Sequence, residues 1–137
     1  MEYEIKNQFL NVKINSRGAE LASVKSVNSD TEFLWQADPE VWNRHAPILF
    51  PIVGRLKNDT YQYQGKSYQL SQHGFARDKE FKLLSQENDA ISLVLRDDEA
   101  SLKEYPCLLY TSPSPRDNAR DLVCRLLLEK KKKRKKH

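Results

Sequence analysis

The sequence predicts an all-β protein, an antiparallel β-sandwich, over roughly its first ninety residues. Three observations predict this fold. Apolar and polar residues alternate at period two in several short runs, turn-forming residues separate the runs, and the runs recur at nearly regular spacing.

Before residue 36 the alternation predicts short strands joined by turns. Phe9, Val12 and Ile14 place apolar side chains on one face, and Arg17-Gly18 marks the turn that follows them. A further strand pair ends at the turn of residues 28–30. The pattern predicts strands at residues 3–6, 9–14, 21–27 and 33–35.

The middle of the chain is marked by prolines. Asp38 is a candidate helix cap with Pro39 at the first helical position, so a helix of about one turn is expected there. Residues 45–55 are apolar, contain two prolines and end in glycine and arginine. This composition predicts a buried, irregular segment.

Two hairpins and a short helix complete the expected elements. Residues 60–63 and 67–70 alternate on either side of Gly65, which supplies the positive φ that such turns often need. Residues 80–85 and 91–96 form the second hairpin. Residues 97–105 are expected to form a short helix, whose start explains the acidic run Asp97-Asp98-Glu99.

Charge divides the chain at residue 106. Residues 107–137 carry ten Lys and Arg residues against three acids, a net charge of +7, and both cysteines. The remaining thirteen basic and sixteen acidic residues leave the first 106 with a net charge of −3. No disulfide framework or metal-ligand spacing is present, so neither a metal nor another cofactor is expected.

Membrane segments are not predicted. No run approaches the roughly 18 apolar residues of a spanning helix, and the first residues lack a basic region followed by an apolar one. A cytoplasmic protein is expected.

Two blocks of sequence indicate a family. The segments LWQAD (34–38) and WNRHAPILFPIVGRL (42–56), and the segment YQLSQHGFARDKEF (68–81), closely resemble blocks of bacterial aldose 1-epimerase proteins. They are especially similar to the branch that contains lactose- and galactose-operon proteins and hexose-6-phosphate mutarotases. The resemblance implies the galactose-mutarotase-like antiparallel β-sandwich, or supersandwich, with residues 1–106 as its incomplete N-terminal part.

The resemblance also implies a reaction and a sugar site. Family members interconvert the α and β anomers of an aldose: a base takes the proton of the anomeric hydroxyl and an acid protonates the ring oxygen. By position, Arg55 and His73 match the arginine and the earlier histidine that hold the sugar. Arg77 matches an arginine that would favour a sugar phosphate. The expected partner is therefore a small sugar or sugar phosphate.

Each of these residues has a structural alternative. Arg55 is compatible with a surface position at a strand edge, His73 with a polar turn, and Arg77 with an exposed turn of mixed charge. For His45 a buried, hydrogen-bonded structural role is expected. For Trp35 and Trp42 a place in the core is preferred over stacking on a sugar ring.

The family pattern stops after residue 106. The general acid histidine and general base glutamate of the family have no counterparts here, so no catalytic residue is assigned and the chain is expected to be an inactive enzyme fragment. A non-catalytic carbohydrate-binding module is the alternative.

Residues 107–117 resemble a translated sequencing-library adapter. Residues 107–137 are therefore expected to be a foreign basic tail, disordered or with a short helix at 123–129. Its basic run permits nucleic-acid binding as a weaker function, but it lacks interleaved aromatic residues and a binding motif, so no nucleic-acid partner is expected.

Overall fold

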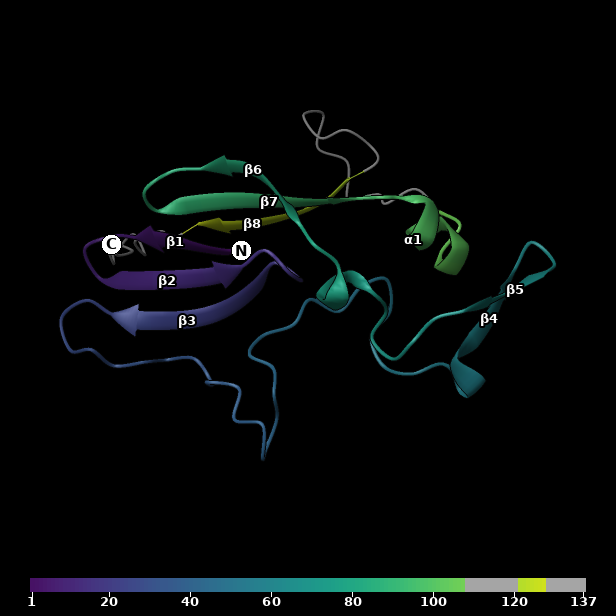
Figure 1. Ribbon diagram of the computed structural model, residues 1–137, viewed down its shortest axis with the longest axis horizontal. Coiled ribbons are helices and arrows are strands. Elements are labelled where there is room, and N and C mark those ends of the chain that lie inside the picture. The colour runs from purple at the N-terminus through teal and green to yellow at the C-terminus, as the bar shows by residue number, and fades with distance from the viewer. Residues whose placement is uncertain (108–120, 128–137) are drawn as a thin grey trace, which may run out of the picture.

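The computed structural model describes residues 1–107 and the backbone of residues 121–127. In these residues eight strands form three antiparallel sheets, with strand orders β1-β2-β3, β4-β5 and β6-β7-β8. The two three-stranded sheets lie together, and the β4–β5 hairpin projects at the opposite end of the molecule from the turn between β1 and β2 (Figure 1). The strands are β1 Glu2–Lys6, β2 Leu10–Asn15, β3 Glu20–Ser26, β4 Thr60–Tyr63, β5 Lys66–Gln69, β6 Lys82–Gln86, β7 Ala90–Arg96 and β8 Asp121–Leu127.

The first sheet follows from the alternation at the start of the chain. Ile5 of β1 faces Val12 of β2, and Val12 in turn faces Val24 of β3. Ile5, Val12 and Ile14 are buried, while the residues between them are at least partly exposed. The predicted strands at 3–6, 9–14 and 21–27 are therefore confirmed to within a residue or two.

The predicted strand at 33–35 is wrong. Here the backbone makes only an isolated bridge between Lys25 and Glu32, and the N–H of Phe33 donates to Val24. The carboxylate of Glu32 accepts from the backbone N–H groups of Val24 (2.8 Å) and Leu34 (2.9 Å). A side chain that takes up these donors replaces the ladder that would have continued the sheet.

The two tryptophans do not lie in the core, contrary to expectation. Trp35 is 42% exposed and Trp42 is 48% exposed. The indole N–H of Trp35 donates to the carbonyl of Trp42 at 2.9 Å, which keeps both residues within the loop. Between them, the carbonyl of Asp38 accepts from the N–H of Trp42, and the carboxylate of Asp38 accepts from the N–H of Glu40. The short helix expected here is therefore a single hydrogen-bonded turn.

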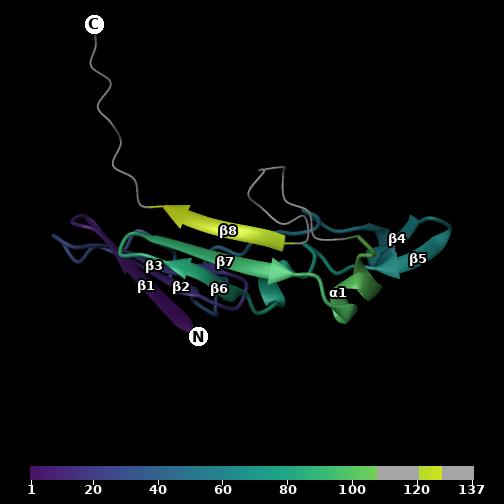
Figure 2. The ribbon, with the colours of Figure 1, turned by 90° about the horizontal axis from the view of Figure 1, so that it is seen from above.

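The second sheet contains the most deeply buried strand. Every residue of β7 from Ile91 to Leu95 is buried, and β6 pairs with it antiparallel, as the second predicted hairpin requires. Figure 2 shows β8 beside β7 on the side away from β6.

The helix expected at 123–129 is replaced by strand β8. Its register runs from Arg96↔Asp121 to Ala90↔Leu127. A short apolar run does not distinguish helix from strand by its periodicity, whereas the open edge of β7 offers a row of unpaired backbone groups. The segment resembling an adapter falls almost entirely in residues 108–120, and the lysine run falls in 128–137; both ranges lie outside the described residues.

One apolar core joins the two sheets to the loops that lead to the candidate site. Phe81, Ile5, Leu70 and Leu93 are among its largest fully buried side chains. The segment 45–55 is irregular, as expected, but only half-buried, and its residues Ile48, Phe50 and Ile52 pack against this core from outside.

A short helix follows β7. Helix α1 spans Glu99–Glu104, within the predicted range. Asp98 caps it by accepting from the N–H of Ser101, and the hydroxyl of Ser101 accepts from the N–H of Asp98. None of the helices seen in residues 1–107 and 121–127 has the length and apolar character to cross a bilayer.

Candidate functional site

Two segments far apart in the sequence are joined side by side at the candidate site. The carbonyl of Phe50 accepts from the N–H groups of Phe75 (3.0 Å) and Ala76 (3.2 Å). Phe50 and Gly74 also form a parallel bridge. The ring of Phe50 packs edge-on against that of Phe75, with 6.3 Å between the ring centroids. The segment that ends in Arg55 is thereby fixed against the segment that contains His73.

Gly54 and His73 form the closest link between these segments. The N–H of His73 donates to the carbonyl of Gly54 at 2.8 Å, and the N–H of Gly54 donates to Nδ1 of the His73 ring at 2.9 Å. Because Nδ1 accepts, the proton of the neutral imidazole lies on Nε2. The ring therefore presents Nε2 on the side away from Gly54, where it lies 3.4 Å from the side-chain amide of Gln72.

Gly74 makes the close approach possible. Its φ is +71°, and a Cβ atom at this position would lie 2.2 Å from the carbonyl oxygen of Phe50. His73 itself has a φ of 66°, which is uncommon for a residue other than glycine. The sequence His73-Gly74 is therefore a compact turn whose backbone directs the imidazole back to Gly54.

Arg55 directly follows Gly54 and points its guanidinium group into solvent. Its side chain is 66% exposed, and Nε and Nη2 donate to the two carboxylate oxygens of Asp59, each at 2.8 Å. These hydrogen bonds, together with the opposite charges, raise the pKa of Arg55. The same guanidinium lowers the pKa of Asp59, chiefly through the hydrogen bonds.

Arg77 lies on the far side of the same turn. Its Nη2 donates to the carbonyl of Gln72 at 2.7 Å, and its Nε lies 3.7 Å from the carboxylate of Asp78. The side chain is mostly buried, unlike the exposed turn residue that was the alternative expectation. Arg77 thus braces the residue that precedes His73.

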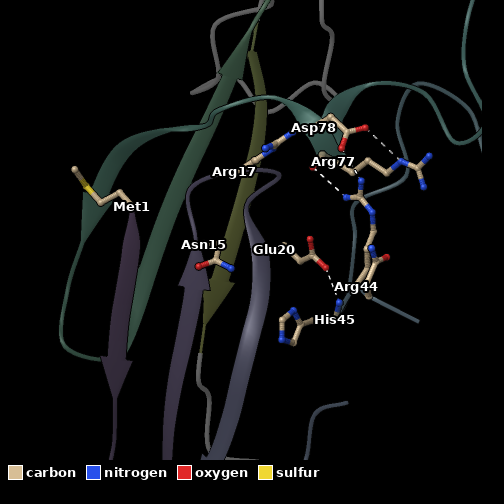
Figure 3. Close-up of a pocket in the computed structure, with 9 residues that line it drawn as sticks. Met1, Asn15, Arg17, Glu20, Arg44, His45, Arg77 and Asp78 are labelled. Carbon is tan, nitrogen blue, oxygen red and sulfur yellow. Dashed lines mark hydrogen bonds and ion pairs between the residues drawn. The ribbon is translucent and has the colours of Figure 1, made fainter. Parts of the chain in front are cut away.

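A polar hollow of about 480 Å³, which Arg77 also lines, lies at the start of β3 (Figure 3). Arg44 donates to Asp78 at 2.6 Å across this hollow. The buried carboxylate of Glu20 accepts from the backbone N–H groups of His45 (2.7 Å) and Ala46 (3.0 Å). The residues that line the hollow are Met1, Asn15, Arg17, Glu20, Asn43, Arg44, His45, Arg77 and Asp78.

His45 differs from its expected structural role. It is half-buried, and its backbone N–H, not its ring, donates a hydrogen bond to the carboxylate of Glu20. Sequence reasoning also missed Glu20, Arg44 and Asp78, since no periodic pattern or motif distinguishes them from surface charges. Within the part of the chain that the structure describes, no cluster of three or more His, Cys, Asp or Glu side chains is arranged to hold a metal ion.

The fold and these two joined segments define a class of protein, the galactose-mutarotase-like β-sandwich proteins. A galactose mutarotase-related enzyme from Lactobacillus acidophilus superposes with a TM-score of 0.76 and 54% identity, over 77% of this chain and 35% of that one. A galactose mutarotase-like protein from Lactobacillus casei superposes with a TM-score of 0.75 and 38% identity, over 77% and 36% of the two chains.

The chain belongs to the aldose 1-epimerase family, whose model matches residues 1–112. The chromosomal LacX protein of Lactococcus lactis subsp. lactis is 38% identical over 110 residues, which are 77% of this chain and 36% of LacX. The chain thus spans about a third of the length of the curated relatives that it matches. The family match confirms the resemblance seen in residues 34–56 and 68–81, and it extends six residues past the expected boundary at 106.

Proposed function

We propose that this chain binds an aldose, free or phosphorylated, through Arg55 and His73. The observation that carries the proposal is the pair of hydrogen bonds between Gly54 and His73. Because Arg55 directly follows Gly54, these bonds place the backbone of Arg55 close to that of His73. Both are hydrogen-bond donors there: the imidazole through Nε2–H and the guanidinium through the N–H groups that Asp59 does not use. Adjacent hydroxyl oxygens of a sugar suit such a set of donors.

Arg77 would add selectivity for a phosphorylated sugar. Its guanidinium group lies next to the carbonyl of Gln72, the residue before His73. A phosphate group accepts strong charge-assisted hydrogen bonds from arginine. The alternative role of Arg77 is to brace the turn. Comparing the binding of neutral and phosphorylated sugars distinguishes these two roles.

The isomerisation itself needs two further groups. Anomer interconversion requires a base at the anomeric hydroxyl and an acid at the ring oxygen. A guanidinium stays protonated and serves as neither, and one ring nitrogen of His73 is engaged by Gly54, so these two side chains cannot supply both the base and the acid. We therefore propose that this chain of 137 residues binds the sugar without isomerising it.

Calorimetric titration with galactose, glucose and glucose 6-phosphate tests the binding. Saturable binding to the unaltered chain is expected, and weaker but measurable binding in Arg55→Ala and in His73→Ala. Lys66→Ala, at the tip of the β4–β5 hairpin, is the matched control and should bind normally. Arg77→Ala should weaken binding of the phosphorylated sugar alone; equal weakening for all three sugars would assign Arg77 to the turn.

Polarimetry on fresh α-glucose and α-galactose tests the lack of catalysis. The rate of mutarotation with the purified chain should equal the rate in buffer. A rate above buffer that disappears in His73→Ala would contradict the proposal and show that the described residues include a sufficient acid and base.

A further inference from the structure

We propose that Asp59 is a positioning residue of the sugar site, which holds the guanidinium group of Arg55 in its binding orientation. The inference rests on the proposed sugar site and adds a residue that no sequence motif indicated. Asp59 lies at the end of the short 3-10 helix Lys57–Asp59, directly before β4.

The contact between the two side chains is bidentate. Oδ1 of Asp59 accepts from Nε of Arg55 and Oδ2 accepts from Nη2, both at 2.8 Å. Of the five N–H donors of a guanidinium group, this geometry uses two along one edge and leaves three for a ligand. The pair therefore fixes the plane of the group without exhausting its donors.

The backbone of Asp59 connects Arg55 to the strand that leads to His73. Its N–H donates to the carbonyl of Leu56, next to Arg55, at 3.1 Å. Its carbonyl accepts from the N–H of Leu70 at 2.9 Å, and Leu70 is fully buried in the core. Asp59 is thus anchored from both sides of the site.

Asp59 adopts a conformation that few residues tolerate. Its φ is 54° and that of Asn58 is 57°, two consecutive left-handed residues that are not glycine. Asp and Asn are the side chains that accept this region most readily, and such strain persists where the surrounding structure maintains it.

Stability does not account for this arrangement. The side chains are 66% and 36% exposed, and exposed ion pairs contribute little to folding free energy. A guanidinium that is already oriented does not lose side-chain freedom when a ligand binds, which improves affinity. The contact therefore fits a role in binding better than a role in folding.

Titration of the purified chain with galactose, using Asp59→Gly, tests the inference. Glycine accepts the left-handed backbone, so the variant removes the carboxylate without adding strain. We expect binding weaker by up to about tenfold, the cost of ordering a long side chain. Asn58→Gly is the matched control at the adjacent left-handed position, and it should bind like the unaltered chain with an unchanged melting temperature.

A double-mutant cycle separates positioning from a general structural effect. In an Arg55→Ala background Asp59→Gly should cause no further loss of affinity, because its effect passes through Arg55. In ¹⁵N spectra the Nε–H of Arg55 should exchange slowly in the unaltered chain and quickly in Asp59→Gly. Asp59→Glu, which keeps the charge, should restore part of the affinity.

Two outcomes would overturn the inference, and they differ from failure of the sugar site itself. Unchanged affinity in Asp59→Gly, or an equal loss of affinity with and without Arg55, contradicts the positioning role of Asp59 and leaves the sugar site itself in place. A chain that binds neither galactose nor glucose contradicts the proposed function, and with it any role of Asp59 in sugar binding.

Discussion

The backbone N–H of Gly54 donates to Nδ1 of His73 at 2.9 Å, while the N–H of His73 donates back to the carbonyl of Gly54 at 2.8 Å. One histidine thus connects two segments through both its backbone and its ring. The orientation of the ring and the position of its proton follow from the same contact.

The neutral form of His73 should carry its proton on Nε2. The reason is that Nδ1 accepts the hydrogen bond from Gly54. Long-range ¹H–¹⁵N correlation spectra above neutral pH would show Nδ1 as the unprotonated nitrogen. A spectrum with the proton on Nδ1 would mean that the Gly54 contact does not persist in solution.

Gly74→Ala should destabilise the protein by about 2–5 kcal/mol, through an unfavourable positive φ and a clash. The added Cβ would lie 2.2 Å from the carbonyl oxygen of Phe50. Gly65→Ala is the matched control: its φ is +76°, but a Cβ there meets nothing within 4 Å, so about 1–2 kcal/mol is expected. Urea unfolding of both variants gives the free energies, and equal losses would contradict the clash.

Asp98→Ala should cost about 1 kcal/mol of unfolding free energy at neutral pH, through loss of the cap of α1. The hydrogen bond from the N–H of Ser101 lowers the pKa of Asp98, against a smaller opposing effect of burial. A lowered pKa means that this stabilisation is complete above the ordinary value of about 4 and is lost as the pH falls through the folded-state value.

The check is urea unfolding of the unaltered chain and of Asp98→Asn at several pH values from 7 to 3. Asparagine keeps a capping oxygen but does not titrate. The stability difference between the two proteins should therefore change only in acid. A difference that varies between pH 5 and 7 would point to another group.

Phe81→Ala should cost about 3–5 kcal/mol, because it leaves a cavity among the residues that join the two sheets. Phe81 is 2% exposed, whereas Phe33, the control, is 63% exposed and its replacement by alanine should have almost no effect. Chemical unfolding monitored by circular dichroism measures both. A small loss for Phe81→Ala would show that the core around it is loosely packed.

The sequence was sufficient for those strands whose burial alternates. Ile5, Val12 and Ile14 mark the inner face of the first sheet, and the arms of both hairpins were located by their turns. The helix after Asp97 was also predictable, because capping depends on a local pattern of side chains.

The errors share a physical cause: contacts of particular groups that the hydrophobic pattern does not encode. Glu32 replaces a strand ladder with side-chain hydrogen bonds, and the carbonyl of Trp42 holds Trp35 outside the core. Residues 121–127 became a strand because β7 has an edge there. The periodicity of the sequence does not indicate these hydrogen-bond partners.

The candidate site was only partly accessible from sequence. The positions of Arg55 and His73 came from resemblance to a family, and their site roles stay predictions. The Gly54–His73 hydrogen bonds depend on how the chain folds back between residues 55 and 73. No spacing rule specifies that return path. Asp59 lies only four residues after Arg55, and their contact depends on the left-handed backbone of Asn58 and Asp59.

Two kinds of hydrogen bond attach residues 32–34 to β3. Those accepted by the carboxylate of Glu32 depend on pH, whereas the bond between the backbones of Phe33 and Val24 does not. Burial opposes the charge of this carboxylate, but hydrogen bonds from Ser23, Val24 and Leu34 outweigh this and lower the pKa of Glu32. On acidification its protonation would weaken these three hydrogen bonds, while the backbone hydrogen bond from the N–H of Phe33 to the carbonyl of Val24 carries no titrating group and would remain. The loop with Trp35 and Trp42 would then loosen while the sheet stays intact, detectable as a change in tryptophan fluorescence before the loss of β-sheet circular dichroism.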